Sequence, residues 1–387
     1  MDAISQLLCD VLDEVRPDAS GAVADYIPQL ASADPDRLGL AIIGPRAGIS
    51  AVGDADTAFT IQSISKAMVF ALAVDRWGPD AVMQKVDVEP SGEPFNAISL
   101  EKGTGRPANP LINAGALAVT SLIPGADIVE RSATILAGLS AFAGRDLAVD
   151  EDVYRSESAT GDRNRALGHL LRSYGIFTDE VDDVVETYFR QCSALVTVQD
   201  LCVMAGTLAF GGRNPLTGER VVSERSARDT VAVMSSCGMY DNSGEWLLRV
   251  GLPAKSGVAG GLIAISPSQF GVGVFSPRLD AHGNTVRGQM VLEKLSERFG
   301  MHVFEAHEAV ATPEVAIRED GDELRVILGG ELSFSGVERV LTRLRDIDLP
   351  GRSIVIDAGG LAQVHPMAID VLRRQVSDSD RRVRVEG

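Results

Sequence analysis

The chain has little positive charge. Its 387 residues carry a formal net charge of −18 at pH 7, and proteins that bind nucleic acid usually present a basic face, so such a partner is not expected. The sequence also lacks an apolar run of about 18 residues, so no membrane-spanning helix or membrane partner is expected. Its amino terminus has no basic segment followed by an apolar run, so we expect no signal peptide and a cytoplasmic location.

Cysteine and histidine are sparse as well. The four cysteines (Cys9, Cys192, Cys202 and Cys237) include no close pair with metal-ligand spacing, and we interpret them as reduced, mostly buried thiols. The five histidines are interpreted as structural or surface residues. The sequence therefore predicts neither a metal site nor a cofactor.

Lysine is scarce, so the few lysines that are present are informative. Of 36 basic residues only five are lysine, and the rest are arginine. Genomic base bias explains such a skew without any function. An amine can lose its proton at a moderate pH, however, whereas a guanidinium cannot, so a retained lysine can mark a site of proton transfer. Lys66 and Lys255 both fall in motifs with possible chemistry.

The segment TIQSISKAMVFALA places Ser63 next to the start of a predicted amphipathic helix over 65–77. Lys66 follows three residues later and would share a face with Ser63. Burial and the positive end of the helix would lower the pKa of Lys66, and a neutral amine beside a serine hydroxyl is an activated nucleophile. The alternative is a serine that caps the helix, followed by an exposed lysine.

Two later motifs favour the catalytic interpretation. Tyr240-Asp241-Asn242 lies in a turn-rich segment, and Lys255-Ser256-Gly257 precedes a strand-like stretch. Ser-x-x-Lys, Tyr-x-Asn and Lys-Ser-Gly, in this order, form the layout of serine penicillin-recognising enzymes. In that layout the tyrosine phenol can relay a proton, and backbone N–H groups can form an oxyanion hole.

A closer resemblance covers residues 20 to 300. It rests on QSISK (62–66), NPLINAGA (109–116), SESATGDRNRAL (156–167), YFRQCS (188–193), GMYDNSG (238–244) and KSGVAGG (255–261). These segments resemble the bacterial and mitochondrial-type glutaminases, which are serine-dependent enzymes. The resemblance implies an α/β (α+β) fold with a β-lactamase/transpeptidase-like sheet flanked by helices, beside a helical lobe. It also implies hydrolysis of L-glutamine, a small-molecule substrate, and assembly as a homo-oligomer, either a dimer or a tetramer.

The same resemblance implies roles for individual residues. Ser63 would be the nucleophile, Lys66 its general base, and Tyr240, with Tyr188, would assist proton transfer. The substrate-binding residues would be Tyr26, Ser63, Asn113, Glu157, Asn164, Tyr188, Tyr240 and Val258, the last through its backbone N–H in the oxyanion hole. A carboxylate and amide groups suit the ammonium and carboxylate of an amino acid. Because Glu157 and Asn164 are seven residues apart, one helix could present both on one face.

Two other functions fit parts of the pattern. A penicillin-binding enzyme or β-lactamase would share the three motifs, although the absence of a signal peptide disfavours that chemistry. A regulatory protein with an inactive hydrolase domain is the second alternative, and the intact Ser63, Lys66, Tyr240 and Lys255 disfavour it.

The pattern changes after residue 304. We expect a catalytic domain over 1–304 that begins with an amphipathic helix over 4–15, a linker over 305–314, and a small α/β domain over 315–387. This second domain would contain a hairpin around Asp320-Gly321, a helix over 335–347, a strand over 353–361, a helix over 365–376 and a short final strand.

The carboxy-terminal segment DAGGLAQVHPMAIDVL (357–372) resembles the STAS fold, a small regulatory module of sulfate transporters and anti-sigma antagonists. The position of the phosphorylated Ser or Thr of the antagonists is Pro366, which has no hydroxyl, so a phosphorylation switch is not expected. The domain is short, and a docking or oligomerisation domain without a ligand is the alternative.

Overall fold

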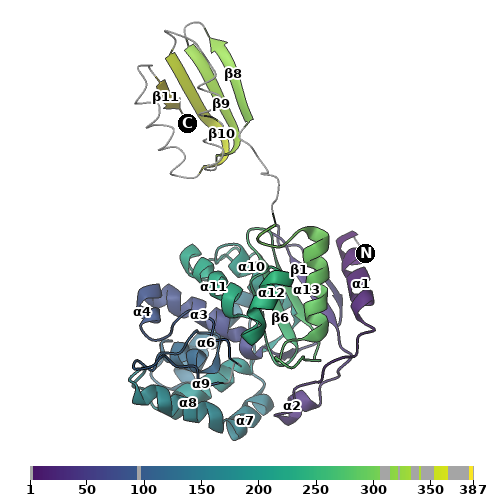
Figure 1. Cartoon of the computed structure of the whole chain (residues 1–387), viewed down its shortest axis with the longest axis vertical. Helices are drawn as coiled ribbons and strands as arrows, with labels where there is room; N and C mark the ends of the chain where they lie inside the picture. The colour runs from purple at the N-terminus through teal and green to yellow at the C-terminus, as the bar shows by residue number, and fades with distance from the viewer. Residues whose placement is uncertain are drawn as a thin grey trace. The chain divides into compact units, whose positions relative to one another are not determined.

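The computed structural model describes residues 3–93, 97–305, 314–320, 323–332, 340, 353–364 and 383–386 (Figure 1). The chain divides into two compact units, residues 1–305 and 306–387. Residues 306–313 of the expected linker lie outside the described residues.

The first unit is built on a five-stranded antiparallel sheet with the order β2-β1-β7-β6-β5. Its strands are β1 (Gly39–Ile43), β2 (Ile49–Gly53), β5 (Ala254–Ser256), β6 (Gly261–Ser266) and β7 (Phe270–Phe275). A separate antiparallel ribbon joins β3 (Phe59–Thr60) to β4 (Leu195–Val196). The predicted strand within 270–277 is confirmed as β7.

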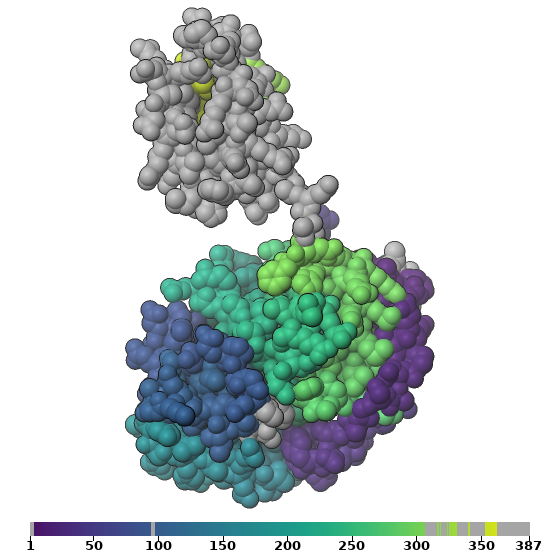
Figure 2. Space-filling view, viewed as in Figure 1, coloured from purple at the N-terminus to yellow at the C-terminus, as the bar shows by residue number. Residues whose placement is uncertain are grey.

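Helices cover both faces of this sheet and form a lobe beside it (Figure 1). The helices are α1 (Ala3–Val15), α2 (Pro28–Ala31), α3 (Ser65–Trp77), α4 (Pro79–Met83), α5 (Asn113–Ser121), α6 (Ile128–Ala143), α7 (Glu151–Thr160), α8 (Asp162–Ser173), α9 (Val181–Cys192), α10 (Val198–Ala209), α11 (Glu224–Cys237), α12 (Ser243–Arg249) and α13 (Val286–Phe299). Helices α1 and α13 pack together on one face, and Figure 2 shows the purple amino-terminal segment against the light-green segment that contains α13. Helix α10 packs on the other face, against β1, β6 and β7.

The sequence of β7 explains how closely α10 approaches the sheet. Val272 and Val274 point into the core beneath α1 and α13. Gly271 and Gly273 alternate with them, as residues on opposite faces of a strand do. A Cβ at Gly271 would lie 2.1 Å from the backbone nitrogen of Gly206 in α10, so only glycine fits at this contact. The backbone of α10 therefore rests directly on the backbone of β7.

The bounds of two predicted helices are confirmed, but one of the two is buried on all sides over most of its length instead of amphipathic. The amino-terminal helix is α1, with Leu8, Val11 and Leu12 buried on one face. The predicted helix over 65–77 is α3, but the expectation that α3 is amphipathic is wrong, because its residues from Ser65 to Ala71 are all buried. Helices α5, α6 and α11 pack around it, so it has no broad solvent-facing side.

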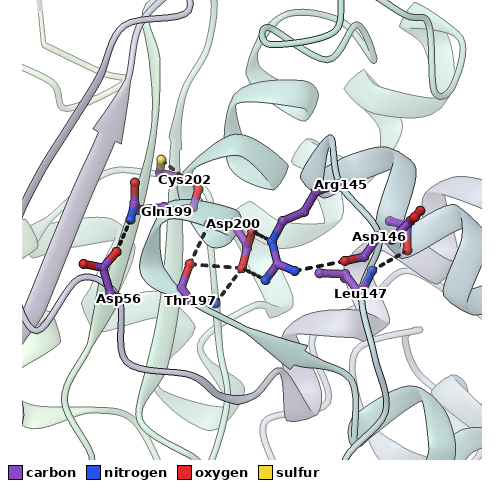
Figure 3. A network of polar contacts seen from close by, with 9 residues as sticks. Asp56, Arg145, Asp146, Leu147, Thr197, Gln199, Asp200 and Cys202 are labelled. Carbon is purple, nitrogen blue, oxygen red and sulfur yellow. Dashed lines mark hydrogen bonds and ion pairs between the residues drawn. The ribbon is translucent and has the colours of Figure 1, made fainter.

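A polar network fixes the start of α10 (Figure 3). Thr197 and Asp200 form a capping box, which supplies partners for backbone N–H groups at the helix start. Arg145 donates from Nε and Nη2 to the two carboxylate oxygens of Asp200, each at 2.6 Å. Because Thr197 directly follows β4 and β4 pairs with β3, this network also anchors the ribbon that leads into residues 61–66.

The second unit contains a four-stranded sheet with the order β11-β10-β9-β8. Strands β8 (Glu314–Asp320) and β9 (Glu323–Leu332) form the predicted antiparallel hairpin, although its turn at 321–322 is outside the described residues. Strands β10 (Ser353–Val364) and β11 (Val383–Glu386) extend the sheet in parallel, and the predicted strand over 353–361 is confirmed as part of β10.

Parallel neighbours require crossover connections, which are usually helices. The expected helix over 335–347 is described only at Val340, which is helical and buried. The expected helix over 365–376, with Pro366, lies outside the described residues. Ile354, Val355 and Ile356 are consecutive and buried, so both faces of β10 are covered at this point.

Among the described residues, no helix has the length and apolar character needed to cross a membrane.

The ion pair at the start of α10, between buried Asp200 and half-exposed Arg145, predicts a stability effect. Asp200→Ala removes the capping carboxylate and the ion pair with Arg145, so the free energy of unfolding should fall by about 1–2 kcal/mol. Asp56→Ala is the control, because Asp56 is an exposed acceptor for Gln199 in the same network and its loss should cost less than about 0.5 kcal/mol. Urea unfolding of the two variants measures the difference, and equal losses would contradict the anchoring role of Asp200.

Candidate active site

Ser63 lies at the centre of a tight turn between β3 and α3. The turn is a 3-10 helix, Gln62–Ile64, and all three of its residues are buried. Gln62 has φ of +49°, a left-handed conformation that costs a residue with a side chain about 1–3 kcal/mol. Backbone strain of this kind often accompanies a functional site, and here it falls on the residue directly before the candidate nucleophile.

Lys66 occupies the first turn of α3, with 1% of its surface exposed. Its Nζ donates to Oδ1 of Asn113 at 2.7 Å and to the backbone carbonyl of Leu111 at 3.4 Å. Both acceptors are neutral, so neither compensates for the loss of water around a charged amine. Burial therefore lowers the pKa of Lys66 to about 8.

Asn113 connects Lys66 to two other predicted residues. It is the first residue of α5, and its Nδ2 donates to Oδ1 of Asn164 in α8 at 3.1 Å. The hydroxyl of Tyr188, from α9, donates to Oδ1 of Asn113 at 3.4 Å. These contacts bring residues from α3, α5, α8 and α9 into one polar cluster.

Glu157 forms a second polar cluster with Gln62 and Tyr26. The hydroxyl of Tyr26 donates to Oε1 of Glu157 at 2.8 Å, and Nε2 of Gln62 donates to the same oxygen at 3.3 Å. Burial raises the pKa of Glu157, and these two hydrogen bonds oppose the rise. Because both donors bind Oε1, these hydrogen bonds fix the orientation of the Glu157 carboxylate through that oxygen alone.

The expectation that Glu157 and Asn164 share a helix is wrong. Glu157 is on α7 and Asn164 on α8, and Gly161 separates the two helices. A Cβ at Gly161 would lie 2.2 Å from Cζ of Phe189, so the chain can change direction here only because the ring packs against a glycine. The two residues therefore reach the site from different helices.

Tyr240 lies in a second strained turn, with φ of +58°. Its hydroxyl donates to the backbone carbonyl of Ser256 at 2.9 Å. Burial raises the pKa of Tyr240, and a hydrogen bond with Ser63 opposes that rise, so the phenol and the candidate nucleophile are in contact. The turn is held by Asn284, whose Nδ2 donates to the carbonyl of Met239 at 3.3 Å.

Lys255 is the second buried amine. It is fully buried in β5, its Nζ donates to the carbonyl of Ser256 at 2.6 Å, and it lies 4.1 Å from the centre of the Tyr240 ring. Burial and the nearby charge of Lys66 lower the pKa of Lys255 well below its usual value. Two of the five lysines are therefore buried amines with lowered pKa values, as the composition suggested.

Val258 lies in the connection between β5 and β6, and it is buried. The preceding residue, Gly257, packs against Ile61 and Ile64, which flank the turn of Ser63. The backbone around Val258 and the backbone of Ser63 are thus neighbours. With this contact, all the residues predicted for the site lie in one region.

Two groups at the candidate site were not predicted from the sequence. Gln62 joins Glu157 to the nucleophile turn, and the carbonyl of Leu111 is an acceptor for Lys66. The position of Gln62 next to Ser63 was a possible signal. A backbone carbonyl carries no signal in the sequence.

A buried serine in contact with a tyrosine, with a lysine of lowered pKa one turn away, is the arrangement expected of a serine hydrolase of the Ser-Lys class. Comparison with known proteins specifies the family. A sequence model described as Glutaminase matches residues 21–304.

Related proteins and solved structures indicate the same family. A glutaminase from Corynebacterium efficiens is 44% identical over 98% of this chain and 89% of its own length. A glutaminase from Clavibacter michiganensis subsp. michiganensis is 52% identical over 76% of this chain and 90% of its own length. The crystal structure of Mglu in its glutamate form superposes with a TM-score of 0.89, at 39% identity, over 100% of this chain and 99% of that one. The chain belongs to the glutaminase family, whose members have a β-lactamase-like fold, and its activity is that of an amidohydrolase.

The buried amine of Lys66 predicts how stability depends on pH. Its folded pKa of about 8 lies below its unfolded value, so the unfolded state binds more protons between these values and folding becomes more favourable as pH rises there. In Lys66→Met this contribution is absent. The free energy of unfolding of the wild type, minus that of the variant, should rise by about 2–3 kcal/mol between pH 7 and pH 10. Urea unfolding at both pH values measures the difference, and a pH-independent difference would contradict the buried amine.

Proposed function

We propose that this protein hydrolyses L-glutamine to L-glutamate and ammonia through a γ-glutamyl ester on Ser63, with Lys66 as general base. The single observation that carries the residue assignment is the buried amine of Lys66, which has a pKa of about 8 and lies one turn after Ser63. At pH 7 about a tenth of such amines are neutral, and burial keeps water from competing for the proton.

In the first half of the reaction the neutral Lys66 accepts the proton of the Ser63 hydroxyl. The Ser63 oxygen attacks the side-chain amide carbon of glutamine, and a tetrahedral oxyanion forms. The C–N bond then breaks, and the proton held by Lys66 passes to the leaving nitrogen, which departs as ammonia. Tyr240, hydrogen-bonded to Ser63, is placed to relay this proton, with Tyr188 assisting through its contact with Asn113.

In the second half a water molecule attacks the ester carbon. Lys66 takes a proton from the water, the ester C–O bond breaks, and the proton returns to the Ser63 oxygen. Glutamate leaves and the free enzyme is restored. In both halves the oxyanion would be stabilised by the backbone N–H groups of Ser63 and Val258. The N–H of Ser63 is suited to this role because the first N–H groups of a helical turn have no acceptor within the turn.

Recognition of the amino-acid end follows from the two polar clusters. The buried carboxylate of Glu157 suits the substrate ammonium, and the charge of that ammonium would offset the burial that raises the pKa of Glu157. The amides of Asn113 and Asn164 would offer N–H donors for the substrate carboxylate, and the hydroxyls of Tyr26 and Tyr188, which donate to Glu157 and Asn113, would line the same part of the site.

The assignment of Ser63 and Lys66 predicts the effect of two substitutions. Ser63→Ala should release no ammonia from glutamine above the level of a blank. Lys66→Arg should lower kcat by at least about a thousandfold, because a guanidinium cannot accept the proton. A coupled ammonia assay on the purified protein measures both.

Lys102→Arg is the control. Lys102 is exposed, so the kcat of this variant should equal that of the wild type. An active Ser63→Ala variant would overturn the nucleophile, and an active Lys66→Arg variant would overturn the base. Covalent labelling by a fluorescent penicillin, with no ammonia release, would instead favour a penicillin-recognising enzyme.

For residues 315–387 we propose a STAS-like module that acts in docking or regulation and takes no part in the chemistry. Its parallel strands β9, β10 and β11 and its doubly covered strand β10 support an α/β module. The Clavibacter relative also supports independence, since its match covers 90% of its own length but only 76% of this chain. We further propose assembly as a dimer or tetramer in the cytoplasm, where the free cysteines Cys9, Cys192, Cys202 and Cys237 would stay reduced.

This proposal predicts that a chain ending at Glu305 keeps its activity. The first unit has its own core, so kcat and KM for glutamine should stay within about twofold of the full-length values. Steady-state kinetics on the two purified chains test this, with circular dichroism to verify folding. A folded but inactive truncated chain would place the second unit in the catalytic machinery.

A further inference from the structure

The left-handed backbone at Gln62 requires something to hold it. A residue with a side chain stays at φ of +49° only when its surroundings fix it there. On one side, the Gln62 side chain donates to Thr60 and Glu157. On the other side, its backbone carbonyl is held by Ser65, which neither the motifs nor the family resemblance assigned to the site.

Ser65 closes the nucleophile turn twice. Its backbone N–H donates to the carbonyl of Gln62, which is the normal bond of a 3-10 turn. Its hydroxyl donates to the same carbonyl at 2.7 Å. Ser63 lies inside the loop that these two bonds close, so the orientation of its backbone depends on them.

Gln191, in α9, holds the hydroxyl of Ser65 in this orientation. Its Nε2 donates to Oγ of Ser65 at 3.0 Å, so the single hydroxyl proton of Ser65 remains available for the carbonyl of Gln62. Oε1 of Gln191 accepts a hydrogen bond from the hydroxyl of Thr120 in α5, at 3.3 Å. Ser65, Thr120 and Gln191 are all at least 97% buried, so water cannot replace these partners.

We infer that Ser65 and Gln191 are positioning residues for the nucleophile. The relay runs from Gln191 through the hydroxyl of Ser65 to the carbonyl of Gln62, and it fixes the backbone of Ser63 relative to Lys66 and the oxyanion hole. Neither residue is among those that the proposed function assigns to the substrate. A misplaced nucleophile loses rate in the chemical step, whereas the relay acts on the backbone carbonyl of Gln62 and not on its side chain, which donates to Glu157. The relay therefore affects kcat and leaves KM nearly unchanged.

The relay rests on the proposed role of Ser63, and kinetics of three variants test it. Gln191→Met keeps the length and volume of the side chain but cannot donate, and Ser65→Ala removes the hydroxyl. Each should lower kcat about 10- to 100-fold, with KM within about twofold of the wild type. The third variant combines both changes. Because both residues act through one hydrogen bond to Gln62, the double variant should be no slower than Ser65→Ala alone.

Thr187→Val is the matched control. Thr187 is a fully buried residue one turn before Gln191 on α9, and its hydroxyl donates only within that helix, to the carbonyl of Asp183 at 2.7 Å. Its loss should change Tm but not kcat. Ammonia release by the wild type at the start of the series establishes the proposed function separately.

Three outcomes would overturn the relay. One is a wild-type kcat in Gln191→Met or Ser65→Ala. Another is a double variant whose loss in kcat equals the product of the two single losses, since independent sites behave in that way. The last is a loss in kcat by Thr187→Val as large as that of Gln191→Met, which would indicate a general effect of packing on α9. A wild type that releases no ammonia would overturn the proposed function instead.

Discussion

Burial of the Lys66 amine is the constraint on which the rest of the site depends. An amine held away from water between neutral oxygens loses part of its preference for the charged form. To create that environment, α3 has to run through the interior, with α5, α6 and α11 packed around it. The charge of Lys66 in turn helps to lower the pKa of the second buried amine, Lys255. The helical lobe is therefore part of the chemistry as well as a support for it.

Backbone strain is a second feature that the parts of the site share. Gln62 and Tyr240 both have positive φ, and their turns meet at Ser63. Each turn is held by partners from other elements, Gln62 by Ser65 and Glu157, and Tyr240 by Asn284 acting on Met239. Hydrogen bonds between distant parts of the chain thus offset a local cost of about 1–3 kcal/mol at each turn. The two strained turns bring Ser63 and Tyr240 into contact.

Local pattern predicted much of this structure, and its limits have physical causes. The periodicity of α1, the alternation in β7 and the Asp-Gly signal between β8 and β9 are properties of neighbouring residues, which a sequence displays directly. The candidate pair of Ser63 and Lys66 was also visible, because a spacing of three residues is close to one helical turn. The break between α7 and α8 was not predicted, since Gly161 is required by a ring that lies elsewhere in the chain. The hydrogen bond of Gln191 to Ser65 spans 126 residues, and no periodicity carries such a contact.

The amide of Asn113 ties two functions to one side chain. Its oxygen accepts from Lys66 and Tyr188, and its nitrogen donates to Asn164. A substitution of Asn113 that alters substrate binding would also remove the hydrogen-bond acceptor of Lys66, the proposed general base. Substrate range and catalytic rate are therefore coupled at this position, whereas Tyr26 and Glu157 belong to the separate cluster that they form with Gln62.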